Sequence, residues 1–138
     1  MALASHPLTA LKQAVRDYLA GDADLTGFLA GNAVFDEAPR GNPAPFAVFA
    51  DATVRDASTN DARAYEILFG ILLQARASEG ALALDAASRI DALLTDASLT
   101  LDGHRLVSLQ ATETQMRQRN DREPWRVTLR LRAFVEPM

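Results

Sequence analysis

The stretch Tyr65-Glu66-Ile67-Leu68-Phe69-Gly70-Ile71-Leu72-Leu73 decides the fold class of this 138-residue chain. Large apolar side chains stand at alternate positions, which is the period of a β-strand with one buried face: Tyr65, Ile67, Phe69, Ile71 and Leu73. Leu68 and Leu72 make the other face apolar as well, and a strand of this kind is usually buried on both sides. We therefore expect a central strand whose second face also needs a cover.

Two further strands are expected on the C-terminal side, at Leu106–Thr114 and Trp125–Val135. Apolar and polar residues alternate in both, as in half-buried antiparallel strands. The inward positions of the first are Val107, Leu109 and Ala111, and those of the second are Trp125, Val127, Leu129, Leu131, Ala133 and Val135. The polar loop Arg117–Pro124 joins the two strands into a long C-terminal β-hairpin.

The N-terminal half begins with an amphipathic helix. Pro7 suits its first turn, Ser5 or His6 its N-cap, and Gly21 its end. The inner stripe has helical spacing: Leu8, Leu11, Val15, Tyr18 and Leu19. Asp22 caps a second, short helix.

The chain between these helices and the central strand is less regular. We expect a short strand at Ala33–Phe35 and an extended loop to Pro45, because prolines fix the backbone and remove donors. Phe46–Ala50 is a strand candidate, and Arg55–Arg63 is expected to be an exposed loop.

After the central strand, Ser78 is expected to cap a helix that reaches about Leu94. Its inner stripe is rich in alanine, which lets a helix lie close to a sheet: Ala83, Ala86, Ala87, Ile90, Leu93 and Leu94. The order of elements predicts an α+β fold, with a mostly antiparallel sheet on which this long helix and the N-terminal helix pack. Residues 1–138 are expected to form a single domain.

Composition narrows the classes of function. A net charge of −4 and a pI near 5.1 argue against general attraction to nucleic acid. The absence of cysteine excludes disulfides, thiolate zinc sites and cysteine nucleophiles. The longest apolar run, Ile67–Leu73, is too short to cross a bilayer, and Met1–Ser5 does not resemble a signal peptide. We expect a soluble protein with no membrane partner that stays inside the cell until assembly or release.

The residues do not predict an enzyme. The two histidines, His6 and His104, have no partners at spacings suited to metal binding or proton transfer. Asp36 and Glu37 are adjacent carboxylates in a polar loop, where solvation is more common than acid–base catalysis. No glycine-rich phosphate loop is present. We therefore expect no catalytic residues, no metal and no cofactor.

Basic residues gather near the C-terminus. One face of the last strand carries Arg126, Arg130 and Arg132. The loop that precedes this strand in the sequence contains Arg117, Arg119 and Arg122. Nearby acidic residues and the lack of interleaved aromatic residues weaken a nucleic-acid interpretation. A solvated face or a polar contact with another subunit is favoured. We take Arg126, Arg130, Arg132, Leu68 and Leu72 as interface candidates.

Several segments together resemble the small tail-terminator or tail-completion family of tailed phages and gene transfer agents. The resemblance spans most of the chain in the family's order: His6-Pro7-Leu8, Ala33-Val34-Phe35-Asp36-Glu37-Ala38-Pro39, Pro45-Phe46-Ala47-Val48-Phe49, Ala86-Ala87-Ser88-Arg89-Ile90-Asp91-Ala92-Leu93-Leu94, Leu101-Asp102-Gly103-His104-Arg105-Leu106-Val107 and Phe134-Val135-Glu136-Pro137. The loop Arg55–Arg63 departs from the pattern of many relatives.

This resemblance implies a structural subunit of a closed ring, typically a hexamer, that ends the tail tube and meets the head connector. The tail tube protein and the connector proteins would be its partners, and DNA would only pass through the ring. The protein would assemble in the bacterial cytoplasm and remain at the head-proximal end of the tail. Two alternatives stay open: a head–tail joining protein of the neck, and a dimeric ligand-binding or regulatory domain.

Overall fold

A computed structural model describes residues 5–41 and 44–138. Residues 1–4, which include most of the stretch used to judge a signal peptide, and Pro43 of the predicted loop lie outside this part. The helices are α1 (Pro7–Ala20), α2 (Ala23–Phe28) and α3 (Gly80–Leu94), with a 3-10 turn at Ala77–Glu79. The strands are β1 (Phe46–Phe49), β2 (Thr53–Asp56), β3 (Tyr65–Ala75), β4 (Thr100–Leu101), β5 (His104–Arg117) and β6 (Trp125–Pro137). This α+β arrangement confirms the predicted fold class.

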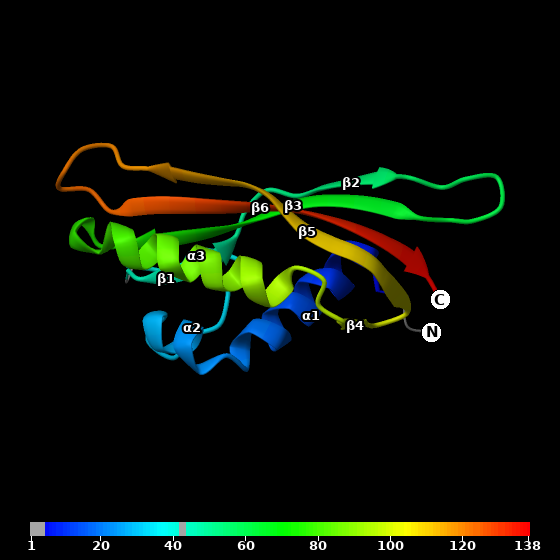
Figure 1. Cartoon of the computed structure of the whole chain (residues 1–138), viewed down its shortest axis with the longest axis horizontal. Coiled ribbons are helices and arrows are strands. Elements are labelled where there is room, and N and C mark those ends of the chain that lie inside the picture. Colours follow the sequence, from blue (N-terminus) through cyan, green and yellow to red (C-terminus); the bar gives the residue numbers. More distant parts are fainter. Residues whose placement is uncertain (1–4, 42–43) are drawn as a thin grey trace.

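The strands form one sheet in the order β1-β3-β6-β5-β4, and β2 pairs with β3 beyond the end of β1. Every pairing of these strands is antiparallel. The helices lie on one side of the sheet (Figure 1). Two hairpin loops extend in opposite directions, 57–64 between β2 and β3 and 118–124 between β5 and β6. We call the two sides the helix-covered face and the helix-free face.

Local sequence explains how the first two helices begin. The His6 side chain accepts a hydrogen bond from the Leu8 backbone N–H at 3.0 Å, with Pro7 in the first turn, so His6 is the N-cap of α1. Asp22 caps α2 in the same way, through the Leu25 N–H at 3.0 Å. Both caps agree with the predictions.

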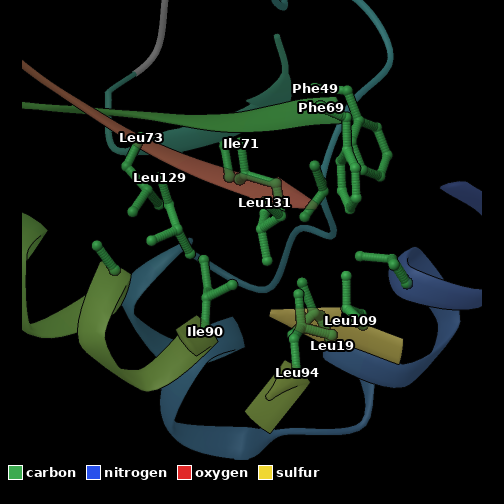
Figure 2. Packing of buried hydrophobic residues seen from close by; sticks show 14 of the residues in the cluster. Leu19, Phe49, Phe69, Ile71, Leu73, Ile90, Leu94, Leu109, Leu129 and Leu131 are labelled. Carbon is green, nitrogen blue, oxygen red and sulfur yellow. The ribbon is translucent and has the colours of Figure 1, made fainter. Parts of the chain in front are cut away.

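The hydrophobic core lies between the helix-covered face and the helices. Figure 2 shows α3 presenting Ile90 and Leu94 to the side chains of β3 and β6. The predicted inward positions Val127, Leu129, Leu131, Ala133 and Val135 are all buried, as are Ala83, Ala86 and Ala87 on α3. Burial of many such side chains supplies most of the driving force for folding.

Several predictions at the edges of elements were wrong. The Ala33–Phe35 strand is reduced to a single parallel bridge between Phe35 and Val48. The predicted loop Arg55–Arg63 begins inside β2 and pairs there with β3. Ser78 does not cap α3, which starts two residues later with Glu79 as N-cap and no side-chain cap. Short-range patterns miss the first two features because pairing to β1 and β3 is a long-range contact.

Two inward assignments were also wrong. Tyr18 is 44% exposed, because α1 turns Leu11, Val15 and Leu19 to the core instead. Val107 is 54% exposed, since β5 bulges there: Leu106 pairs with Val135 and Ser108 with Phe134, which leaves Val107 without a partner. A second bulge at Thr112 restores the alternation that places Met116 inward.

Candidate functional site

The helix-free face carries all five of the interface candidates. Successive side chains of a strand point to opposite faces, so the residues between the buried positions of β3 and β6 share this face. The register places Leu68 opposite Arg132 and Leu72 opposite Thr128. Leu68 and Leu72 are half-buried, not fully buried as the doubly apolar pattern predicted. The helices of the described residues all lie on the other side of the sheet (Figure 1).

Part of this face is closed by the chain itself. Phe46 and Val48 stand opposite Gln74 and Leu72, on the helix-free face, and both are buried. The closed part lies at the β1 edge. Leu68 and Leu72 of β3, opposite Arg132 and Thr128 of β6, are only half-buried.

An open hollow of about 1000 Å³ occupies this face at the end where β5 and β6 meet in their loop. We call it the arginine hollow. Its walls include Leu72, Arg117, Arg119, Arg126, Thr128 and Arg130. The fold thus brings together three of the five candidates, Leu72, Arg126 and Arg130, while Leu68 and Arg132 lie outside it.

The three arginines of β6 differ in what they contact. Arg132 donates to the Glu66 carboxylate at 2.8 Å and lies over the Phe134 ring, 4.8 Å from its centre. Arg126 and Arg130 have no carboxylate within 4.0 Å among residues 5–41 and 44–138. Arg132 is therefore held within the subunit, and the charges of Arg126 and Arg130 are available to a partner.

A tryptophan fixes the hairpin end that carries these arginines. Trp125 Nε1 donates a hydrogen bond to the carbonyl of Ala77 at 3.1 Å. Ala77 lies in the 3-10 turn that precedes α3 in the sequence. Gly80 makes room for the ring, because a Cβ at this position would lie 2.7 Å from Trp125 Nε1. The alternating pattern predicted that Trp125 points inward, but its partner on the turn before α3 could not be found from spacing alone.

Asp36 has a structural role. It accepts ion pairs from Lys12 at 3.0 Å and Arg16 at 2.8 Å, which tie the loop before β1 to α1. These hydrogen-bonded cations lower the pKa of the Asp36 carboxyl below its ordinary value. The paired carboxylate therefore stays ionised near neutral pH.

His104 starts β5 after the Asp102-Gly103 turn, as predicted, and its Nε2 lies 2.9 Å from the Ser5 carbonyl oxygen. Across the described ranges, no group of three or more histidine and acidic residues is placed to hold a metal ion. None of the helices in those ranges is long and apolar enough to span a membrane.

Charge is divided unevenly along the chain. Residues 104–138 hold seven arginines and four acidic residues, while residues 1–103 hold seven basic and fourteen acidic residues. The β5–β6 hairpin is thus basic in a chain whose net charge is −4. Such a separation favours contacts between unlike parts of two molecules.

Comparisons with known proteins agree on one relationship. A family model described as "Tail completion protein gp17" matches residues 13–136. A chain of a solved structure described as "Virion of native gene transfer agent (GTA) particle" superimposes with a TM-score of 0.84 at 31% identity. The alignment covers 96% of this chain and 99% of that one. No curated protein sequence matches the chain.

Proposed function

The chain belongs to the tail completion protein family of structural virion proteins, and from this premise we propose that it forms a closed ring at the head-proximal end of a tail. The ring, with six copies favoured, would end the tail tube and present a surface to the head connector. Such a subunit would assemble in the bacterial cytoplasm and stay in the particle. DNA would pass through the ring without being bound by sequence.

The observation that carries this proposal is the match over nearly the full length of both chains to a component of a gene transfer agent virion. A match confined to a few strands would support only a common sheet. Here the helical layer and the sheet are both included, since only 4% of this chain lies outside the alignment.

The helix-free face supports the proposed assembly. It combines half-buried leucines with arginines that have no partner in the described part of the subunit. Apolar residues rimmed by charge are typical of surfaces that another protein covers. A ring provides that cover for every copy, because each subunit meets two neighbours.

Deletion of the gene in the producing strain tests this proposal. We expect tails of abnormal length or tails detached from heads in electron micrographs, together with normal DNA replication and normally filled heads. The wild-type gene supplied in trans should restore joined particles. Normal tails attached to full heads in the deletion strain would contradict the terminator role, and heads that leak DNA beside tails of normal length would point to the neck instead.

The ring is tested separately on the purified protein by native mass spectrometry and light scattering, alone and with the tail tube protein. We expect a single closed species with a fixed copy number. A protein that remains monomeric under both conditions would contradict ring formation.

A further inference from the structure

A second hollow lies on the side of the molecule opposite the helix-free face, between α2 and α3. Its volume is about 220 Å³. Leu25, Phe28, Leu82 and Ala86 make its floor and walls apolar, and Leu82 is 50% exposed. Asp24 and Asp85 stand at its rim. We call it the acidic hollow.

The one arginine at this rim is already neutralised. Arg89 donates to both carboxylate oxygens of Asp22, at 3.1 and 2.6 Å. By contrast, Asp24 and Asp85 form no ion pair within 4.0 Å among the described residues. An exposed leucine beside two unpaired carboxylates suits a partner that offers both apolar and basic side chains.

The arginine hollow has that combination. Leu72 supplies the apolar side chain there, and Arg126 and Arg130 supply cations that form no ion pair among the described residues. The two hollows therefore complement each other in charge and both contain apolar surface. They belong to opposite sides of the molecule. The helices α2 and α3, which line the acidic hollow, lie on one side of the sheet (Figure 1), whereas Leu72, Arg126 and Arg130 of the arginine hollow point to the other side.

We propose that the arginine hollow of one copy packs on the acidic hollow of the next copy, with Leu72 near Leu82 and Arg126 and Arg130 near Asp24 and Asp85. Two different surfaces in contact make a head-to-tail interface, which repeats from copy to copy and forms a ring when the rotation closes. This inference rests on the proposed ring and names the surfaces that build it.

The proposed contact also accounts for two features that the isolated subunit leaves unexplained. It would cover Leu72, which none of the described helices reaches, and Leu82, which is the most exposed leucine of α3. It would pair arginines in a basic hairpin with carboxylates in the acidic remainder of the chain. An acidic segment of the tail tube or connector could pair with the arginine hollow but not with the acidic hollow.

Cross-linking tests the geometry directly, because the chain has no cysteine of its own. The double variant Leu72→Cys/Leu82→Cys should form, on mild oxidation, a ladder of covalent oligomers beyond the dimer. The two positions lie on opposite sides of the sheet, so a disulfide within one copy is excluded by geometry. The matched control is Val107→Cys/Leu82→Cys, whose first cysteine replaces an exposed side chain on the β5 bulge outside both hollows.

Charge reversal tests the recognition. Arg126→Glu/Arg130→Glu should lower the apparent association constant by about tenfold or more, and Asp24→Lys/Asp85→Lys should do the same. Each variant alone carries two hollows of like charge. An equimolar mixture should associate again, because the acidic sheet surface of the first variant meets the basic helical surface of the second.

The outcomes separate this inference from the ring itself. A closed wild-type oligomer whose two cysteine variants cross-link equally slowly would overturn the interface and leave the ring intact. A ladder without any closed species would support the interface and contradict the ring. Recovery in the mixture also shows that the reversed subunits are folded, and failure of the mixture with folded variants would overturn the pairing of the two hollows.

Discussion

The two faces of the sheet share the same backbone but differ in what completes them. On the helix-covered face, Ile71 and Leu73 of β3 are fully buried by α3 and by their neighbours in the sheet. On the helix-free face, Leu68 and Leu72 of the same strand are left half-buried beside arginines. The first face is satisfied within one chain. The second is suited to a partner, and the contrast separates residues that determine folding from residues that are free to determine assembly.

The comparison is sharpest at adjacent residues that point to opposite faces. Leu73→Ala should destabilise the isolated subunit by about 2–5 kcal/mol, because it leaves a cavity in the packed core. Leu72→Ala should cost about 1 kcal/mol or less, since part of that side chain is already in water. Chemical denaturation measures both free energies of unfolding.

In assembly we expect the opposite order of effects: Leu72→Ala should weaken subunit association more than Leu73→Ala does. If Leu72 lies in a subunit contact, Leu72→Ala weakens association although it spares the fold. Equal losses of stability for the two variants would show that the helix-free face is packed as tightly as the core, and the comparison would fail.

Arginines on the helix-free face provide the next, smaller contrast. Arg132→Glu should destabilise the subunit by about 1 kcal/mol, because it replaces the partner of Glu66 with a second carboxylate. Arg130→Glu should stay within about 0.5 kcal/mol of the wild type, since no ion pair is lost. Thermal unfolding of the two matched variants measures the difference.

The difference between Arg132 and the other two arginines decides which variant best tests the helix-free face. Reversal of Arg126, Arg130 and Arg132 together is the obvious test of this face, because all three side chains point away from the core. The Arg132–Glu66 pair means that the triple variant also perturbs the subunit, so the double Arg126→Glu/Arg130→Glu variant is the cleaner one. Identical stability of Arg130→Glu and Arg132→Glu would contradict an internal role for Arg132.

The smallest effect is expected at the Asp36 contact with α1. Its folded-state pKa is lowered from the ordinary 3.8 by Lys12 and Arg16, so its contribution to stability is present above that value and is lost as the pH falls through the folded pKa. Asp36→Asn should therefore lower the unfolding temperature slightly at pH 7 and not at a pH below the folded pKa. Asp36 is largely exposed, and solvent screening keeps the effect small.

Melting curves of wild type and Asp36→Asn between pH 7 and pH 2 measure this dependence. Glu37→Gln is the matched control, because the neighbouring carboxylate forms no ion pair among the described residues. A difference between Asp36→Asn and wild type that persists unchanged at the lowest pH would show that the charge of Asp36 is not the cause.

Periodicity predicted the regular elements well and their exceptions poorly. The inward positions of β6 follow strict alternation and were all identified, because an uninterrupted strand keeps its period of two. Val107 was assigned to the wrong face because bulges in β5 shift the period, and a bulge depends on the pairing with β6. The strand β2 was missed because three of its four residues are polar and because it pairs with β3 only in the folded chain.

The candidate surface shows the same division. The alternation of arginines with apolar residues was enough to put Arg126, Arg130 and Arg132 on one face. Their different surroundings depend on neighbours distant in sequence, namely Glu66 beside Arg132 and Leu72 in the hollow that Arg126 and Arg130 line. The acidic hollow was not found at all, because its walls come from two helices that are separated by the whole β1–β3 region.

The sequence by itself determined the α+β class, the family resemblance, the caps of α1 and α2 and the buried faces of β3 and β6. These features depend on local hydrogen bonds and on the period of apolar residues, which are properties of short segments. Only the tertiary structure decided that α1 and α3 lie on the same side of the sheet. That choice leaves Leu68 and Leu72 without a helix, because a two-layer fold can cover only one face of its sheet.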